Sequence, residues 1–260
     1  MRIPMFQVDA FTSRIFGGNP AAVCVLETLL DDETLQNIAA ENNLSETAFL
    51  VEHEGSYGLR WFTPKLEIDL CGHATLASAF VVFSFLNTGL SCVHFDTASG
   101  LLTVEKQNDL LSMDFPARPP VRYDPGEALA EALGARPKEV YKARDILAVF
   151  EQEAQIREMR PDFEKIAQRT DAFAVIVSAP GNSVDFVSRF FAPSAGIPED
   201  PVTGSAHCTL IPFWAERLGR SKLRARQLSS RGGELICEHL NARVKIGGRA
   251  VLYSKGEIIL

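Results

Sequence analysis

Short apolar runs, bounded by turn residues, recur along the whole chain. Runs of about four to eight residues that alternate between apolar and polar, or that are continuously apolar, are typical of β-strands. In the first half we predict strands at Phe6–Phe11, Ala21–Leu26, Ala48–Val51, Leu59–Phe62, Val93–Asp96, Leu101–Lys106 and Leu110–Phe115. In the second half we predict strands at Val140–Ala143, Leu147–Phe150, Phe173–Ser178, Asp185–Phe191, Leu235–Glu238 and Ala250–Tyr253. The pattern therefore indicates a chain rich in β-sheet.

Helical patterns are fewer. Asp31–Glu41 begins with acidic residues that suit the dipole of a helix N-terminus, and Phe163–Gln168 occupies the corresponding place in the second half. Ala74–Leu86 is apolar on nearly every side, so a helix there must be buried all round, which predicts a sheet curved around it. Ala206–Leu218 is the counterpart in the second half, and Pro212 inside it should remove one backbone hydrogen bond and kink the helix.

Motifs of the first half recur in the second half in the same order. The pairs and their offsets are Arg60-Trp-Phe-Thr-Pro and Arg189-Phe-Phe-Ala-Pro (129 residues), Gly72-His-Ala and Gly204-Ser-Ala (132), and Ala48-Phe and Ala172-Phe (124). A fixed order with a drifting offset is what small loop insertions produce between two copies of one supersecondary unit.

The repeat predicts an α+β fold of two pseudo-symmetric lobes. Each lobe is expected to be a curved, barrel-like sheet wrapped around a central helix. We place the first lobe at residues 1–116 and the second at 120–248, joined near the proline-rich segment 116–120. A final strand at about 250–260 is expected to pair back onto the first lobe.

Composition and charge exclude several classes of function. The 260 residues are 46% hydrophobic and 23% charged, which is typical of a globular protein. A formal net charge of −7, without a block of Lys and Arg, argues against nucleic acid as a partner. The most basic stretch, residues 217–231, is interleaved with leucines and is interpreted as a solvated face. The run Ala74–Leu86 is too short to span a bilayer, so no membrane role is expected.

The cysteines and the N-terminus both favour a reducing compartment. The five cysteines are an odd number and show no C-x-x-C spacing. The N-terminal residues read as a strand, because Gln7 and Asp9 interrupt any hydrophobic core of a signal peptide. We therefore expect a cytoplasmic protein.

A short glycine turn precedes the central helix of each half. The turns are Asp69–Thr75 and Glu199–His207, with Gly72 and Gly204 at the helix starts. Unpaired backbone N–H groups and a partial positive charge at a helix start bind carboxylates, so Gly72, Gly204 and Ser205 are candidate substrate-binding residues. Alternatively, each glycine only serves its turn, and Ser205 or Thr203 caps the helix.

Three residues could move a proton near these turns. Glu46 lies at the entry to an apolar strand, where a carboxylate is costly unless it faces a cleft. His73 follows the first glycine directly, and Asp200 lies four residues before the second. Glu46 could instead be a solvated loop residue, and His73 and Asp200 could be purely structural. No dinucleotide, P-loop, H-E-x-x-H or paired-cysteine motif is present, so the sequence gives little support for nucleotide chemistry or for a metal site.

Six sequence blocks together resemble one known family. They are Phe6-Gln-Val-Asp-Ala-Phe-Thr, Phe16-Gly-Gly-Asn-Pro-Ala-Ala-Val, Asn43-Leu-Ser-Glu-Thr-Ala-Phe, Arg60-Trp-Phe-Thr-Pro, Cys71-Gly-His-Ala-Thr and Glu199-Asp-Pro-Val-Thr-Gly-Ser-Ala-His. They resemble the PhzF family of phenazine biosynthesis-like isomerases, relatives of diaminopimelate epimerase and proline racemase. The resemblance covers essentially the whole chain. It implies two similar lobes with an active site in the cleft between them.

The resemblance also implies roles for individual residues. Glu46 corresponds to the general acid/base of the family, whereas His73, Asp200 and Ser205 correspond to residues that line its pocket. It implies a cofactor-independent isomerase that acts on a small carboxylate-bearing substrate, and a homodimer is considered as its assembly. Preorganised N–H donors would stabilise the negative charge that forms when a proton leaves carbon.

Two alternative functions remain at the level of sequence. The racemase and epimerase relatives use two thiols, each just before its glycine, but this chain has Cys71 at the first place and Thr203 at the second. A threonine hydroxyl is far too weak an acid to replace a thiolate. A relative that has lost its chemistry and only binds a small acid is the other alternative. Retention of Glu46, His73, Asp200 and Ser205 together argues against it.

Overall fold

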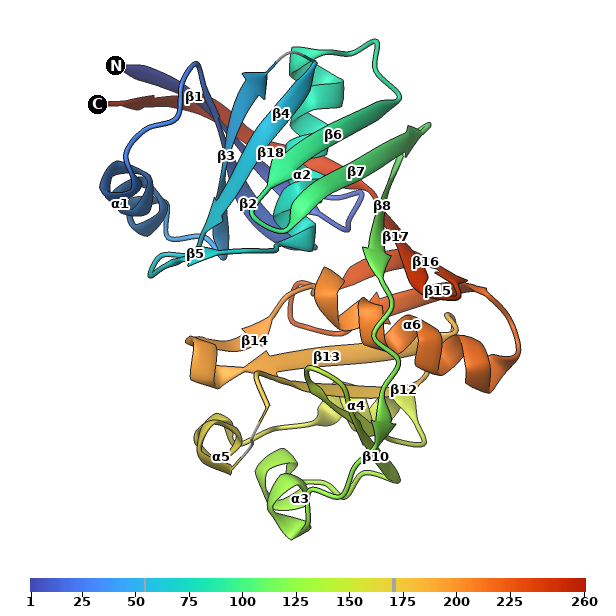
Figure 1. Cartoon of the computed structure of the whole chain (residues 1–260). Coiled ribbons are helices and arrows are strands. Elements are labelled where there is room, and N and C mark those ends of the chain that lie inside the picture. Colours follow the sequence, from blue (N-terminus) through green and yellow to red (C-terminus); the bar gives the residue numbers. More distant parts are fainter. Residues whose placement is uncertain (54, 170–171) are drawn as a thin grey trace. The chain divides into compact units, whose positions relative to one another are not determined.

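The computed structural model describes residues 1–53, 55–169 and 172–260, which form two compact units (Figure 1). Unit 1 comprises Met1–Asp114 and Gly247–Leu260, and unit 2 comprises Phe115–Ile246. The first unit is thus completed by the C-terminal strand, which pairs antiparallel with the N-terminal strand from Arg2↔Ile259 to Ala10↔Ala250.

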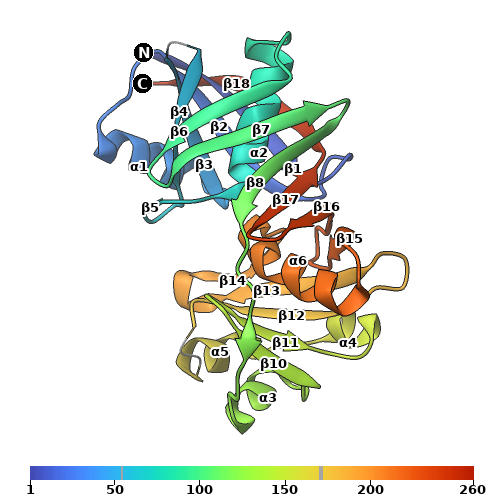
Figure 2. The same ribbon diagram turned by 45° about the vertical axis from the view of Figure 1, so that its right-hand side comes forward.

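Unit 1 is a curved sheet wrapped around a central helix, as both ribbon views show (Figures 1 and 2). Its helices are α1 (Asp32–Asn42) and the central α2 (Gly72–Val81), which continues into a π-helical segment, Val82–Leu86. Its strands are β1 (Arg2–Ala10), β2 (Asn19–Leu26), β3 (Glu46–His53), β4 (Ser56–Phe62), β5 (Glu67–Ile68), β6 (Cys92–Thr97), β7 (Gly100–Gln107), β8 (Leu110–Pro116) and β18 (Ala250–Ile259).

Unit 2 has the same plan around its own long helix, α6 (Gly204–Leu218). Its smaller helices are α3 (Glu127–Leu133), α4 (Glu153–Glu158), α5 (Phe163–Arg169) and a 3₁₀ turn, Pro193–Ala195. Its strands are β9 (Val121–Arg122), β10 (Glu139–Lys142), β11 (Ile146–Val149), β12 (Val175–Pro180), β13 (Phe186–Ala192), β14 (Ile197–Asp200), β15 (Lys222–Gln227), β16 (Gly233–Leu240) and β17 (Arg243–Gly248).

Strand pairings repeat from one unit to the other. In unit 1 the pairs β1–β2, β3–β4, β4–β5 and β6–β7 are antiparallel, whereas β2–β3 and β4–β6 are parallel. In unit 2 the pairs β10–β11, β12–β13, β13–β14 and β15–β16 are antiparallel, whereas β11–β12 and β13–β15 are parallel. Two copies of one α+β unit are therefore confirmed, each a curved sheet with a central helix.

The strand register corrects one of the sequence matches. Ala48 pairs with Trp61, whereas the residue that pairs with the equivalent Phe190 is Ile176, not Ala172. The predicted strand at Phe173–Ser178 also begins too early, because Phe173 precedes β12 and is exposed. A two-residue apolar match is too short to fix a register when the true partners are both apolar.

Helix α2 is almost entirely buried, as its composition predicted. Nine of its ten residues are buried, all except Phe80. The hydroxyls of Thr75 and Ser78 donate to the carbonyls of the residues four positions earlier, at 2.5 and 2.8 Å, so they leave no unsatisfied group in the core. The prediction of one α-helix to Leu86 was wrong in its last turns, where the chain becomes π-helical and exposes Phe85 and Leu86. A segment that is apolar on all sides has no polar face to mark where the helix changes.

Helix α6 runs through Pro212 because a backbone donor from outside the helix replaces the missing bond. Pro212 has no N–H, which leaves the carbonyl of Cys208, four residues earlier, without its helical donor. The backbone N–H of Arg118, in the segment that follows β8, donates to that carbonyl at 2.8 Å. The proline therefore creates an acceptor that fixes this segment against α6.

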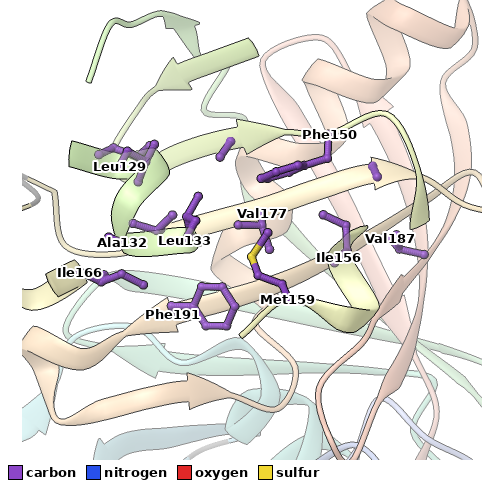
Figure 3. Close-up of a cluster of buried hydrophobic side chains, with 14 residues drawn as sticks. Leu129, Ala132, Leu133, Phe150, Ile156, Met159, Ile166, Val177, Val187 and Phe191 are labelled. Atoms are coloured by element: carbon purple, nitrogen blue, oxygen red, sulfur yellow. The ribbon is translucent and has the colours of Figure 1, made fainter. Parts of the chain in front are cut away.

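The core of unit 2 depends on two helices that the hydrophobic pattern did not predict (Figure 3). Leu129 and Leu133 of α3 and Ile156 of α4 pack with Val177 and Phe191 in one buried cluster. Helices of seven and six residues are too short for a 3.6-residue period to stand out. No helix among the described residues of either unit is long and apolar enough to span a membrane.

Buried His207 makes the stability of unit 2 sensitive to acid. Its Nδ1 lies 2.8 Å from the carbonyl oxygen of Thr203, its ring lies 5.9 Å from that of Phe186, and burial lowers its pKa to about 4. In the unfolded chain, His207 takes up a proton near pH 6.5. The contribution of neutral His207 to stability is therefore complete above pH 6.5 and is lost as the pH falls towards 4. Between pH 7 and pH 4.5, we expect the free energy of unfolding, measured with urea, to fall by about 2 kcal/mol more in the wild type than in His207→Gln. Equal losses in the two proteins would show that His207 is not held neutral.

Candidate active site

Glu46 is placed by a tight turn between α1 and β3. Asn43 ends α1 in the left-handed conformation, with φ 49°, and its N–H donates to the carbonyl of Ala39 at 3.2 Å. The Asn42 amide donates to the Thr47 hydroxyl at 3.1 Å. Asparagine tolerates this conformation better than most residues, so the chain passes directly from the helix into β3. Glu46, the first residue of β3, is 6% exposed.

The Glu46 carboxylate faces the imidazole of His73, at the start of α2. Glu46 Oε2 lies 2.8 Å from His73 Nε2, and both side chains are more than nine-tenths buried. The other ring nitrogen, Nδ1, lies 3.1 Å from the Asn19 amide nitrogen. No described residue donates a well-directed hydrogen bond to Oε2, so the contact with His73 is an ion pair rather than a linear hydrogen bond. This oxygen retains the capacity to accept a proton.

Cys71 completes the group in unit 1. It occupies the N-cap position of α2, and its Sγ lies 3.6 Å from His73 Nδ1 and 4.0 Å from Nε2. Burial raises the pKa of the Cys71 thiol, so the thiol is neutral at pH 7. Burial alone would lower the pKa of His73, but the Cys71 and Glu46 side chains raise it well above its ordinary value.

The start of α2 also offers unpaired backbone donors. The N-cap residue Cys71 makes no side-chain capping bond, and the N–H of Thr75 is bonded to the carbonyl of Cys71 at 3.1 Å. The N–H groups of Gly72 and His73 lie before this bond in the first turn, where an α-helix has no internal acceptors. They are the donors that a carboxylate would use.

In unit 2, Asp200 and Thr203 form the turn before α6. Asp200 ends β14 and is 8% exposed, and the Thr203 hydroxyl donates to Asp200 Oδ2. Thr203 is the N-cap residue of α6, as the structural alternative expected, although its side chain makes no capping bond. Gly204 is buried and Ser205 is half-buried in the first turn.

Gln227, on β15, holds this turn in place. Its Oε1 accepts from the N–H of Thr203 at 2.9 Å. Its Nε2 donates to the carbonyl of Asp200 at 2.8 Å and lies 3.2 Å from the Thr203 hydroxyl. Gln227 is fully buried, so its amide fixes both ends of the turn from inside the unit.

Equivalent arginines fix the strands that lead into the two helix starts. Arg60 on β4 forms a two-bond bridge to Glu67 of β5, with both distances 2.6 Å. Arg189 on β13 forms the same bridge to Glu199 of β14, at 2.7 and 2.9 Å. The repeated motif that begins with arginine therefore has a structural role, since each bridge holds the short strand before a helix start.

Sequence reasoning missed two side chains of these groups, Asn19 and Gln227. Asn19 follows Gly18, which must be glycine because its φ is +62° and a Cβ would lie 2.0 Å from the carbonyl oxygen of Ala10. Nothing in the sequence assigns the side chain that follows this glycine to His73. Gln227 had a signal, since the buried residues Leu223 and Ala225 alternate along the strand and place Gln227 on the same inward face. Treating residues 217–231 as one solvated face concealed it.

A Gln227→Leu substitution is expected to lower the free energy of unfolding by about 2 kcal/mol, because a buried N–H and carbonyl lose their partners. Thr203→Val and the double variant complete a double-mutant cycle, for which we expect a coupling energy of about 1 kcal/mol in urea unfolding. Additive effects would mean that Gln227 does not act through the turn.

Comparisons with known proteins agree on one family. The PhzC-PhzF family model, described as phenazine biosynthesis-like protein, matches residues 8–256. An uncharacterized isomerase of Pseudomonas aeruginosa is 49% identical over 260 residues, which cover 100% of both chains. The crystal structure of a PhzF-family phenazine biosynthesis protein from Enterococcus faecalis superposes with a TM-score of 0.98 at 49% identity, covering 100% of both chains.

More distant structures share the fold. A probable proline racemase from Agrobacterium radiobacter superposes with a TM-score of 0.65 at 10% identity, over 99% of this chain and 93% of that one. This similarity shows the fold of the racemases and epimerases, and no more. Together with relatives that are named isomerases, the family match supports an isomerase- or epimerase-like function.

Proposed function

Because the chain belongs to the PhzF family of phenazine biosynthesis-like proteins, we propose that it is a cofactor-independent isomerase with Glu46 as general acid/base. The proposed reaction moves a proton between two carbons of a small carboxylate-bearing substrate. One observation carries the proposal: a buried Glu46 carboxylate lies 2.8 Å from His73, and its Oε2 receives no directed hydrogen bond from a described residue.

The chemistry follows from what each group can donate or accept. Glu46 takes a proton from a carbon next to an electron-withdrawing group and returns it to another carbon. Negative charge then forms on the substrate, and the first-turn N–H groups at Gly72 and His73 can stabilise it without reorganisation. His73 orients the carboxylate between the two transfers. In unit 2, we propose that Asp200, Gly204 and Ser205 form a carboxylate-binding group at the start of α6.

The reaction needs one acid/base, and the repeat supplies only one. The register that aligns Ala48 with Ile176 aligns Glu46 with Ala174, which has no titratable group. A single carboxylate suits a proton that leaves and returns on one face of the substrate. Inversion of a carbon normally needs acid/base groups on two opposite faces.

Solvent exchange tests the proposal directly. We would incubate the protein with a panel of small cyclic and unsaturated carboxylic acids in deuterated water and follow deuterium incorporation by NMR. We expect a new isomer to appear, with deuterium at the carbon to which Glu46 returns the proton. A protein that only binds acids would raise the melting temperature with some of them and exchange none.

A two-thiol racemase is disfavoured by the structure of the helix starts. The Thr203 hydroxyl is bonded to Asp200, and burial raises the pKa of Cys71. We therefore expect Cys71→Ser to keep most of the activity in the exchange assay. A loss on the order of a thousandfold with an unchanged melting temperature would instead require thiol chemistry and would favour the racemase.

A further inference from the structure

Three side chains of unit 1 offer one oxygen, one sulfur and one nitrogen atom to a common point. The ligand atoms of Glu46, Cys71 and His73 all lie within 4.8 Å of one another, and the three residues are 6%, 5% and 4% exposed. Within the described ranges, no other group of three or more such residues is close enough to share a metal ion.

This donor set suits zinc better than other common divalent cations. Zinc binds thiolate, imidazole and carboxylate at about 2.0–2.3 Å, so tetrahedral ligand atoms lie about 3.3–3.6 Å apart. Here Cys71 Sγ lies 4.0 Å from His73 Nε2, and Nε2 lies 2.8 Å from Glu46 Oε2. Both distances lie within about 0.5 Å of that range. A sulfur ligand excludes magnesium and calcium, which prefer oxygen.

We propose that Glu46, Cys71 and His73 form a reversible zinc site, and that bound Zn²⁺ inhibits the isomerase. The inhibition rests on the function proposed above, whereas the binding does not. Zinc would take the Glu46 lone pair that must accept the substrate proton. The protons of the Cys71 thiol and of His73 Nε2 would be released to the buffer as the ligands bind. A fourth position is left for water, as in other three-ligand zinc sites.

Binding is tested on the full-length protein after treatment with a chelator. Calorimetric titration with ZnCl₂ should give one site, and Co²⁺ in its place should give a thiolate-to-cobalt charge-transfer band. Cys71→Ala should weaken zinc binding by at least about a hundredfold and abolish the band. Loss of a residue that only hydrogen-bonds a metal ligand already lowers the metal affinity about 10- to 100-fold, and Cys71 is itself a ligand. Wild-type protein that binds no zinc, or a band that survives in Cys71→Ala, would overturn the proposal.

The chain offers a matched control in its other close cysteine–histidine pair. Cys92 Sγ lies 3.9 Å from His94 Nε2 in an exposed pair on β6. Cys92→Ser removes one thiol beside one imidazole, as the test variant does, but leaves the group around Glu46 intact. Its zinc affinity should match that of wild type. If Cys92→Ser abolishes binding and Cys71→Ala does not, the zinc site is at the surface and the proposal is wrong.

Inhibition is measured, for each protein, as the ratio of its deuterium-exchange rates with and without zinc. The zinc-free rates of the wild type and the variants therefore need not be equal. One equivalent of zinc should suppress exchange by wild type and by Cys92→Ser, and should leave the ratio near one in Cys71→Ala. Absence of exchange in zinc-free wild type would defeat the proposed isomerase but not the metal site, which the titrations test independently. Tight binding without inhibition would overturn the regulatory role.

Discussion

Glu46→Gln is expected to lower the rate of deuterium exchange and of isomerisation by roughly 10² or more, the usual contribution of a general acid–base group. Glutamine keeps the size of the side chain and an oxygen that can face His73, but it cannot accept a proton. Ligand affinity and melting temperature should change little. His73 can release its additional proton once the carboxylate is gone, so no uncompensated charge stays buried.

Glu52→Gln provides the control for this substitution. It makes the same chemical change on the same strand, at the exposed end of β3, and should exchange at the wild-type rate. The measurement is solvent deuterium incorporation, with thermal denaturation and ligand titration alongside. Exchange by Glu46→Gln at the wild-type rate would remove Glu46 as the base, and His73 or Asp200 would then take that role.

The repeat could be found in the sequence because equivalent positions of the two units have the same structural role and the same residue. Arg60 and Arg189 recur because each bridges a glutamate on the next short strand, and Gly72 and Gly204 recur because each begins a buried helix. Apolar β-strands carry no such marker. The match of Ala48 to Ala172 therefore failed by four residues, while the arginine motifs stayed in register.

The candidate site could be predicted only in part, because contacts between distant residues decide it. The spacing around Gly72 indicated that His73 begins a helix, but only the parallel pairing of β2 with β3 brings Asn19 and Glu46 to the same end of the sheet. A sequence does not show which nitrogen or oxygen atoms surround a thiol, so the contacts of Cys71 with His73 could not be predicted. Gln227 required knowledge of which face of β15 is buried.

Arg189→Met is expected to cost about 3 kcal/mol or more in the free energy of unfolding. The Arg189 side chain is 8% exposed, and its guanidinium makes two bonds to Glu199 and also donates to the carbonyls of Ile156 and Met159 at 3.1 and 2.8 Å. Methionine preserves much of the packing over Phe191 but leaves a partly buried carboxylate and two carbonyls without their donor. Urea unfolding measures the loss.

Arg60→Met is the matched variant, because Arg60 makes the equivalent bridge and packs over Phe62 as Arg189 packs over Phe191. The Arg60 side chain is 23% exposed, and the side chain of its additional partner, Asp32, is 80% exposed. Water can replace the lost bonds at such a site, so we expect a cost of about 1 kcal/mol. The difference between the two variants then measures the combined contribution of burial and of the two backbone carbonyls that Arg189 binds. Equal costs would show that solvent exclusion around Arg189, and its two carbonyl partners, contribute nothing to the stability of the turn that leads to α6.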